Sequence, residues 1–214
     1  MGTSKYVVTV TRQFGSMGRP IAKKMAEKLG IEYYDREIVD KAAAQLHLPV
    51  STINEEEERA HTQIKSNFIS MMFPFGAVGS ESVSVPSARD ETRDRIFEAQ
   101  KDIIQFLAEK DTCVIVGRCA DFVLSDMKNV VNIYIYASYD ARLRHCIEDL
   151  GMDKEEAEKM ISAVDAARDE YHMRYAGYHA DDKRFKDIMI DSSFLGVDGT
   201  ADYLAEAIRQ KFQS

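Results

Sequence analysis

One stretch decides the fold: Tyr6-Val-Val-Thr-Val-Thr-Arg-Gln-Phe-Gly-Ser-Met-Gly-Arg-Pro-Ile-Ala-Lys-Lys-Met-Ala-Glu-Lys-Leu29. Its β-branched run Val7–Thr11 predicts a buried strand. A short loop that contains Gly15 and Gly18 follows this strand. Apolar residues then recur at the spacing of one helix face, at Ile21, Met25 and Leu29. The sequence therefore predicts a strand, a glycine loop and a helix in succession.

This order of elements is typical of a phosphate-binding loop. Glycines let backbone N–H groups close on an anion, and the N-terminus of the following helix adds partial positive charge. The common P-loop motif is G-x-x-x-x-G-K-[ST]. Here Gln13 stands at the first glycine, Arg19 at the lysine and Pro20 at the hydroxyl residue.

Two interpretations of the loop remain open. It is an ordinary turn with Pro20 opening the helix, a position that suits proline, or it binds phosphate. The phosphate interpretation is favoured by the position of the loop directly after the first strand. It is also favoured by the basic residues around it, which are Arg12, Arg19 and Lys23.

Composition limits the class of protein. The chain has 214 residues, 45% of them hydrophobic and 30% charged, which is enough for one large core in a globular protein. A net charge of −8 argues against a broad nucleic-acid-binding face. No apolar run approaches the about 18 residues of a membrane span, and the N-terminus has no signal-peptide pattern. We therefore expect no nucleic-acid partner and no membrane partner.

The cysteines indicate a reducing compartment. Cys113, Cys119 and Cys146 are odd in number and lack C-x-x-C spacing. They predict reduced thiols and neither a disulfide framework nor a zinc site. We therefore expect a cytoplasmic protein.

Strand-like and helical segments alternate along the chain. Alternation of this kind predicts an α/β fold with a parallel five-stranded sheet flanked by helices, in a single domain over residues 1–214. In such sheets ligands bind at the carboxyl ends of the strands. The expected strands are Tyr6–Thr11, Ile31–Tyr34, Cys113–Val116, Val130–Tyr136 and Ile188–Ile190.

Two insertions interrupt the alternation. Residues 37–110 are mostly helical in pattern, and residues 140–187 form a long charged helical region. Within the first insertion, the apolar segment Phe68–Phe75 favours a core or a dimer contact, so a homodimer is possible. Gly76–Arg89 is rich in glycine, serine and valine, and we expect a mobile loop there. Residues 150–185 have high charge and few apolar anchors, which predicts a mobile lid.

Charged residues follow the expected strands at the edge where ligands bind. Phosphoryl transfer needs several arginines or lysines that converge on phosphates. Arg118 comes directly after Gly117 at the end of an apolar strand, a poor place for an idle guanidinium. The alternative for each residue is a surface ion pair, which contributes little. The candidates are Asp35, Arg36, Arg118, Asp121, Arg142, Arg144, Asp165 and Arg168.

Blocks of this sequence, taken as a set, resemble motifs of one kinase family. Thr11–Arg19 resembles its variant phosphate loop, and Ile21–Arg36 its second strand with an aspartate. Cys113–Asp121 resembles its Gly-Arg motif, and Tyr136–Arg144 its Ala-Ser turn and lid arginines. Ile190–Ser193 resembles its adenine-side turn. The chain thus resembles the cytidylate kinase-like family, relatives of bacterial cytidylate kinase among the nucleoside monophosphate kinases.

This resemblance implies a fold, a reaction and a set of roles. The fold would be P-loop NTPase-like, with helical acceptor-binding (37–110) and lid (140–187) insertions. The reaction would be transfer of a phosphoryl group from ATP, with Mg²⁺, to CMP or dCMP. The donor-binding residues would be Arg12, Gly15, Ser16, Met17, Gly18 and Arg19. The acceptor-side residues would be Asp35, Arg36, Lys41, Arg118, Asp121, Asp165 and Arg168. The residues acting on the transferring phosphoryl would be Arg19, Arg118, Arg142, Arg144 and Arg168.

The chain departs from the family pattern in two places. Pro20 removes the hydroxyl that would hold Mg²⁺, and Ser16 could replace it only if the loop backbone takes another path. Cys119 stands where an aspartate would follow Gly-Arg, so Asp121 would have to supply a carboxylate on the metal side. Two alternatives therefore stay open: a kinase for another small metabolite, and a nucleotide-binding regulatory module with little turnover.

Overall fold

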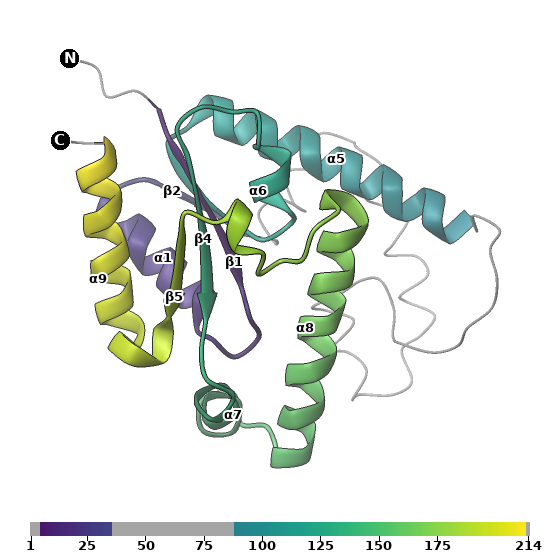
Figure 1. Ribbon diagram of the computed structural model, residues 1–214, viewed down its shortest axis with the longest axis vertical. Coiled ribbons are helices and arrows are strands. Elements are labelled where there is room, and N and C mark those ends of the chain that lie inside the picture. The colour runs from purple at the N-terminus through teal and green to yellow at the C-terminus, as the bar shows by residue number, and fades with distance from the viewer. Residues whose placement is uncertain (1–4, 36–87, 213–214) are drawn as a thin grey trace.

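The computed structural model describes residues 5–35 and 88–212 (Figure 1). Its strands are β1 (Val7–Arg12), β2 (Glu32–Tyr34), β3 (Cys113–Val116), β4 (Val130–Tyr136) and β5 (Ile188–Asp191). Its helices are α1 (Gly18–Leu29), α5 (Ala88–Lys110), α6 (Ala120–Val123), α7 (Tyr139–Glu148), α8 (Lys154–Ala176) and α9 (Ser192–Phe212), with the short 3₁₀ helix η2 (Lys183–Phe185). Every predicted strand is present, with ends that differ by no more than one residue.

The strands form one parallel sheet in the order β2-β3-β1-β4-β5. β1 lies at its centre, with Val8 opposite Val114 of β3 and Val131 of β4. Because all strands run in one direction, their carboxyl ends meet at one edge, where sheets of this kind bind ligands. The predicted α/β fold with a parallel five-stranded sheet flanked by helices is confirmed.

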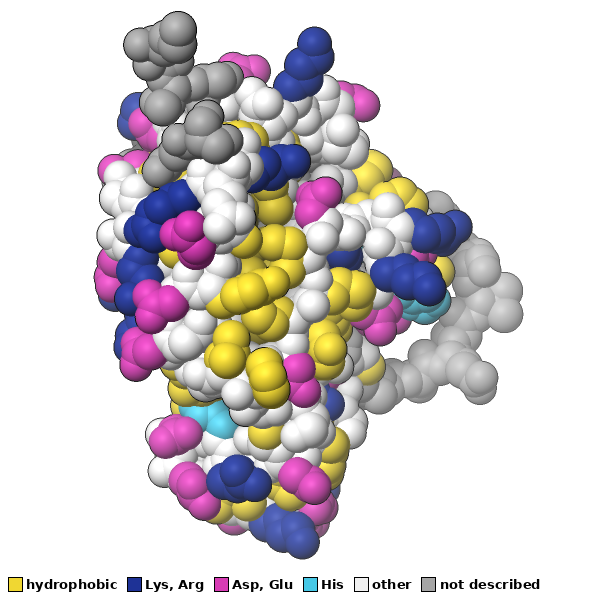
Figure 2. Space-filling model, turned by 60° about the vertical axis from the view of Figure 1, so that its left-hand side comes forward, with side chains coloured by type: hydrophobic (Ala, Val, Ile, Leu, Met, Phe, Trp, Pro, Cys, Tyr) yellow, Lys and Arg dark blue, Asp and Glu magenta, His cyan; other side chains and the backbone are white. Residues whose placement is uncertain are grey.

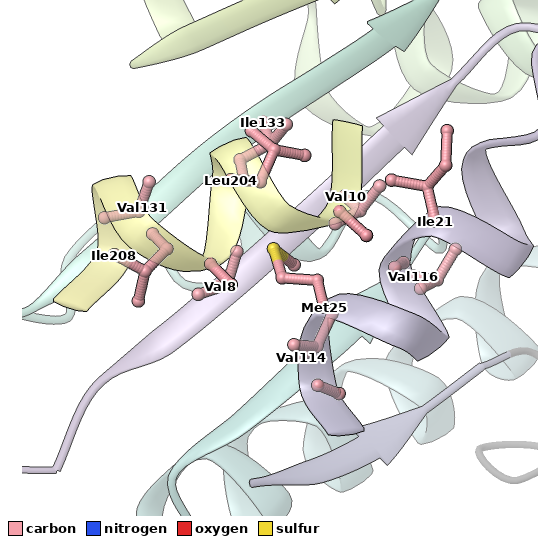
Figure 3. Packing of buried hydrophobic residues seen from close by; sticks show 14 of the residues in the cluster. Val8, Val10, Ile21, Met25, Val114, Val116, Val131, Ile133, Leu204 and Ile208 are labelled. Atoms are coloured by element: carbon pink, nitrogen blue, oxygen red, sulfur yellow. The ribbon is translucent and has the colours of Figure 1, made fainter. Parts of the chain in front are cut away.

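Helices α1 and α9 cover one face of the sheet (Figures 1 and 3). Alternate side chains of a strand point to opposite faces, and Val8 and Val10 both point toward these two helices. There they meet Met25 of α1 and Leu204 of α9, and all four side chains are buried. Each fully buried side chain of this kind contributes about 1.5–3 kcal/mol, so this layer fixes the register of β1 and hence the position of the loop after it.

Helices α5 and α6 cover the opposite face. Val7 of β1 and Ile115 of β3 point into this second apolar layer. Helix α8 joins it through its C-terminal half, where the ring of Tyr175 stacks on Phe97 of α5 with centroids 3.9 Å apart. The last two turns of α8 are thus part of the core and not of a detached segment.

The structure describes only residues 88–110 of the first insertion but all of the second. Helix α5 occupies residues 88–110 of the first insertion, in agreement with its mostly helical pattern, but it includes Ala88 and Arg89, which were expected at the end of the mobile loop Gly76–Arg89. Arg36, Lys41, Phe68–Phe75 and residues 76–87 lie outside the described residues, so the predictions for them stay predictions. The second insertion contains α7 and α8.

The expectation of few apolar anchors in the second insertion is wrong. Four buried side chains of α8 pack with Phe14 and Cys146 in a third apolar cluster. The long charged surface of α8 conceals this stripe in the sequence, because exposed residues outnumber it. The four anchors are Ala157, Met160, Ile161 and Val164.

Strand β5 is at the edge of the sheet, and apolar side chains are exposed near it. Met189 of β5 and Phe194, Leu195 and Tyr203 of α9 are all exposed. Figure 2, which brings the side with α9 forward, shows hydrophobic side chains gathered in a patch with charged side chains around it. Homodimer formation stays a prediction. Among the described helices, none is long and apolar enough to cross a membrane.

Candidate active site

The loop between β1 and α1 has the backbone shape of an anion-binding concavity. Gly15 has φ 75° and Met17 has φ 58°, whereas Ser16 between them has a negative φ. Backbone that alternates in this way turns neighbouring N–H groups toward one side. Helix α1 begins at Gly18 with Met17 as its N-cap, so the positive end of the helix dipole faces the same region. The predicted strand, glycine loop and helix are thus confirmed.

The N–H groups of this loop are available to a ligand. In the part of the chain that the structure describes, no acceptor takes a hydrogen bond from the N–H of Gly15, Met17 or Gly18. Met17 lacks a capping side-chain hydrogen bond as well. Pro20 has no N–H, so the first turn of α1 presents fewer donors than an ordinary phosphate-binding helix.

The inner side of the loop is held by two buried serines. The Ser16 hydroxyl donates to the carbonyl oxygens of Gln13 at 3.0 Å and Ile135 at 3.2 Å. The Ser192 hydroxyl, at the start of α9, donates to the carbonyl oxygen of Ser16 at 2.7 Å. Ser16 is 1% exposed, so its hydroxyl points into the protein. The idea that Ser16 replaces the missing metal ligand is therefore wrong for this backbone. Ser192 is a supporting residue that sequence reasoning missed.

Phe14 fixes the tip of the loop to α8. Its ring is buried in the apolar cluster of α7 and α8, and its N–H donates to Asp165 Oδ1 at 2.7 Å. The other oxygen of Asp165 pairs with Arg142, which also donates to the carbonyl oxygen of Phe14 at 3.3 Å. The resemblance implied an acceptor-side role for Asp165, but its contacts are with Phe14 and Arg142. Arg142 therefore stabilises the loop through its hydrogen bond to Phe14 and its ion pair with Asp165.

Two glycines make room for the side chain of Arg12. A Cβ at Gly18 would lie 2.6 Å from the Cβ of Arg12, and one at Gly117 would lie 2.5 Å from its Nη1. The side chain of Arg12 therefore extends from the start of α1 to the end of β3, across the carboxyl edge of the sheet. Gly18 and Gly117 are needed for this side chain, and no pattern in the sequence pairs them with it.

Positive charge gathers around the Arg12 guanidinium. Burial lowers the pKa of Arg12 well below its ordinary value, and the charges of Arg168, Arg118 and Arg19 lower it further. Arg168 donates to the carbonyl oxygen of Arg12 at 3.0 Å, and burial lowers the pKa of Arg168 to about 10. Among the described residues no carboxylate pairs with Arg12. Like charges held together in this way favour an anion between them.

Arg19 and Asp35 pair with each other. Arg19 Nε lies 2.8 Å and Nη2 2.5 Å from Asp35 Oδ2, and Tyr33 donates to the same oxygen at 3.4 Å. The family resemblance implied that Arg19 binds the donor phosphates and that Asp35 lies on the acceptor side. In this structure Arg19 and Asp35 form an ion pair, whereas no carboxylate of residues 5–35 and 88–212 pairs with Arg12.

Arg118 sits in a strained turn. Gly117, Arg118 and Cys119 have φ values of 80°, 56° and 52°, and a left-handed conformation in a residue other than glycine costs about 1–3 kcal/mol. The turn brings Arg118 close enough to repel the charge of Arg12. Cys119 is buried, and burial raises the pKa of its thiol. The turn therefore directs Arg118 to the edge of the sheet while Cys119 stays inert.

Asp121 belongs to a buried cluster with other protein groups. Its carboxylate contacts His172 Nε2 at 3.1 Å, pairs with Lys186 and accepts from the Tyr178 hydroxyl at 3.4 Å. The side chain of Asp121 is 1% exposed. Its predicted roles as a substrate contact and as a metal-side carboxylate do not fit this environment, because protein donors occupy its oxygens. We assign Asp121 a structural role that joins α6, α8 and the segment before β5.

Protonation of Asp121 should weaken the fold. Burial alone would raise the pKa of Asp121, but the hydrogen bond and charge of His172, with the charge of Lys186, lower it to about 2. An unfolded aspartate titrates near about 3.9, so this contribution is fully present above that pH and is lost as the pH falls toward 2. The expected loss is about 2 kcal/mol.

Urea unfolding between about pH 7 and about pH 2 measures this loss. Asp121→Asn should be less stable at neutral pH and should have a flatter pH dependence than the wild type. Asp126→Asn serves as the control, because Asp126 is an exposed aspartate a short distance further along the chain. Equal pH dependence in the wild type and Asp121→Asn would contradict the assignment.

Two cavities lie beside the loop, and different loop residues line each of them. The first has a volume of about 300 Å³ and lies beside α8. It is lined by Arg12, Gln13, Tyr134, Asp165, Arg168, Asp169, His179, Ala180 and Asp181. The second has a volume of about 240 Å³ and is lined by the loop, α7 and the start of α9, including Gly15, Met17, Arg144, Ser193, Gly196 and Val197. Arg144 is thus separate from the guanidinium group around Arg12.

The described residues do not fit a protein-bound Mg²⁺. They contain no cluster of three or more His, Cys, Asp or Glu side chains that could hold a metal. Pro20 offers no hydroxyl, Ser16 points inward, and Asp35 and Asp165 each pair with an arginine. Oxygen ligands of the kind that Mg²⁺ prefers are therefore already engaged.

The chain is similar to proteins of known structure and matches one family profile. A crystal structure of an uncharacterized protein from Eubacterium ventriosum ATCC 27560 is 26% identical, with a TM-score of 0.68, and the match covers 95% of this chain and 98% of that chain. Shikimate kinase from Acinetobacter baumannii, in complex with shikimate, is 14% identical, with a TM-score of 0.48 and coverage of 97% and 93%. Shikimate kinase from Bacteroides thetaiotaomicron is 13% identical, with a TM-score of 0.49 and coverage of 96% and 99%. No curated protein matches the chain. A profile described as the cytidylate kinase-like family matches residues 7–194.

Proposed function

Because the chain belongs to the cytidylate kinase-like family, we propose that it transfers the γ-phosphoryl group of ATP to a small phosphorylated acceptor, CMP or dCMP. Membership in this family supports a small-molecule kinase. The observation that carries the proposal is the convergence of Arg12, Arg118 and Arg168 beside an anion-binding loop. Phosphoryl transfer depends mainly on positioning and charge neutralisation, which is what such a group supplies.

The two cavities suggest which part of the site each substrate would occupy. The donor phosphates would lie against the N–H groups of Gly15, Met17 and Gly18, next to Arg12. The nucleoside of ATP would occupy the second cavity, with Arg144 at its rim. The acceptor would occupy the first cavity, where Arg168 and Tyr134 line the wall.

In this arrangement a phosphate oxygen of the acceptor attacks the γ-phosphorus, and the bond from the γ-phosphorus to the β–γ bridging oxygen breaks to release ADP. A phosphate acceptor is largely ionised at neutral pH, so no protein base is required. Arg118 and Arg168 would stabilise charge on the transferring oxygens, since both lie close to Arg12. Mg²⁺, which family membership implies, would be held largely by phosphate oxygens, because the described residues contain no cluster of three or more His, Cys, Asp or Glu side chains that could bind it.

The pairing of Arg19 with Asp35 favours a second candidate. If this pair persists when ATP is bound, the loop lacks the cation that usually reaches the γ-phosphate. The chain would then bind nucleotide as a regulatory module with little turnover.

A coupled assay of ADP release separates these candidates. CMP, dCMP, UMP and AMP are tested as acceptors in Mg²⁺ and in EDTA, and ATP binding is followed by calorimetry. We expect turnover with CMP and dCMP well above the ATP hydrolysis seen without acceptor. ATP binding without turnover of any acceptor would favour the regulatory module. Turnover that is confined to UMP or AMP would overturn the cytidylate assignment and keep the kinase.

A further inference from the structure

The first cavity, which the proposed function gives to the acceptor, is lined by groups of both charges. The guanidinium groups of Arg12 and Arg168 contribute to its wall, and so do the carboxylates of Asp169 and Asp181. Tyr134 of β4 is close to both kinds of group, because burial and the charge of Asp181 raise the pKa of its hydroxyl whereas the charge of Arg168 lowers it. A ligand that fills this cavity therefore meets cations on one part of the wall and carboxylates on another.

The acidic part of the wall is fixed to α8 by Asp169. His179 Nδ1 lies 2.7 Å from Asp169 Oδ2, and the N–H of Ala180 donates to Asp169 Oδ1 at 3.1 Å. Both oxygens of this carboxylate thus hold the segment of His179, Ala180 and Asp181, and all three of these residues line the cavity. Because Nδ1 faces Asp169, the ring nitrogen that a ligand can reach is Nε2.

His179 is a hydrogen-bond donor when it is protonated. The hydrogen bond to Asp169, with the charges of Asp169, Asp181 and Asp182, raises the pKa of His179 above its usual value. Both ring nitrogens of a charged imidazole carry a proton. Below its raised pKa, His179 therefore offers the N–H of Nε2 close to the carboxylate of Asp181, which can only accept.

A donor close to a carboxylate complements one edge of cytosine. The N4 amino group of cytosine donates and the adjacent ring nitrogen N3 accepts, and carboxylates are common partners of N4. Uracil has the opposite pattern on the same edge, with O4 as an acceptor and N3–H as a donor. The carboxylate would repel O4, so the acidic wall discriminates between two bases of nearly equal size.

We propose that Asp181, with His179 beside it, is the specificity-determining group that selects cytosine over uracil in the acceptor. The proposal rests on the proposed function, because it takes a nucleoside monophosphate as the ligand of the first cavity. The phosphate of this ligand would lie toward Arg168, and its base would lie toward Asp181. The cavity wall thereby supplies a physical reason for the preference for CMP over UMP.

The ratio of kcat/KM for CMP to kcat/KM for UMP measures this selection in the coupled assay. We expect a ratio above one for the wild type. Asp181→Asn should lower the ratio by at least about tenfold, the value of one good contact to a base edge. The amide of asparagine can accept from N4 but can also donate to O4, so UMP should gain while CMP loses.

Asp182→Asn is the matched control at the next position. It removes the same charge, but Asp182 bonds to Arg184 Nε at 3.0 Å and is not among the residues that line the cavity. Its ratio should equal that of the wild type. Circular dichroism confirms that both variants are folded.

The pH dependence of the same ratio tests His179. Its pKa is raised, so the Nε2 proton is present at low pH and is lost as the pH rises through the raised value. Neutral His179 presents Nε2 as an acceptor, which suits uracil N3–H, so the ratio should fall between about pH 5.5 and about pH 8.5. His179→Gln does not titrate and should give a constant ratio. The charged and titratable groups that face His179 are Asp169, Asp181 and Asp182, with Arg12, Tyr134, Asp165 and Arg168 across the cavity.

The outcomes separate this inference from the proposed function. A wild type that phosphorylates CMP, with a ratio that Asp181→Asn leaves unchanged, would overturn the inference and leave the kinase. An equal fall in Asp182→Asn would also overturn it, because the loss would then follow the charge of the segment and not the cavity wall. A ratio that falls in Asp181→Asn but does not vary with pH would remove His179 from the proposal. Absence of turnover with both acceptors would overturn the proposed function and the inference together.

Discussion

Arg168→Ala is expected to lower kcat by about 10³, the lower end of the effect of arginines that act on a transferring phosphoryl group. Arg168 lines the first cavity and donates to the carbonyl oxygen of Arg12 at 3.0 Å. Burial lowers its pKa to about 10, which still leaves it charged at neutral pH. Its charge would act mainly in the transition state, so KM should change much less than kcat.

Two variants on helix α8 make this test specific. Arg174→Ala removes an exposed guanidinium that pairs with Asp94, and it should leave kcat unchanged. Arg168→Lys keeps the charge without the fork and should recover a small part of the rate. The free energy of unfolding of Arg168→Ala should fall by about 1.5–3 kcal/mol, because the carbonyl oxygen of Arg12 loses a charged donor. A kcat within about tenfold of the wild type in a folded Arg168→Ala protein would place the reacting phosphoryl group elsewhere.

Asp165→Ala should lower the free energy of unfolding by about 3 kcal/mol, because it leaves Arg142 without its carboxylate partner. The Arg142 side chain is only 10% exposed. The same change removes the acceptor of the Phe14 N–H, which lies 2.7 Å from Asp165 Oδ1. For a chain of this size the melting temperature should fall by roughly 6–12 °C.

Urea unfolding and thermal unfolding both measure this loss. Asp169→Ala is the matched control on the same helix, since Asp169 pairs with the exposed His179 and should contribute no more than about 1 kcal/mol. Asp165→Asn keeps an oxygen for the Phe14 N–H and should be intermediate in stability. Equal losses in Asp165→Ala and Asp169→Ala would show that the loop does not depend on α8.

Local patterns in the sequence predict the sheet, because each strand is a short β-branched or apolar run between helical segments. The position of Arg118 at the ligand-binding edge follows from the same reasoning, since parallel strands end together, whereas Arg168 reaches this edge from helix α8. The sequence does not predict that the Arg12 side chain lies between Gly18 and Gly117, because these glycines are far apart in the chain. Their pairing with Arg12 depends on the β1–β3 register.

The errors in the predicted site share a physical cause. Arg19 and Asp35 were each assigned to a ligand, but in this structure Arg19 in the first turn of α1 pairs with Asp35 directly after β2. Asp121 was assigned to substrate from its position near Arg118, whereas its partners His172 and Lys186 come from distant segments. The burial of Phe14 could have been predicted from the sequence, because a large apolar residue in a glycine loop is expected to pack against another element.

The burial of Phe14 among α7 and α8 has a practical consequence for anyone who wishes to isolate a minimal nucleotide-binding fragment. The loop takes its shape from Asp165 and from an apolar cluster that lies about 150 residues further along the chain. A fragment that ends after β4 would keep the glycines but lose the groups that hold them in place. Because Ser192 at the start of α9 also holds the loop, a fragment that keeps this shape must extend through α8 and at least to Ser192, and chimeric proteins must exchange the loop, α8 and Ser192 together.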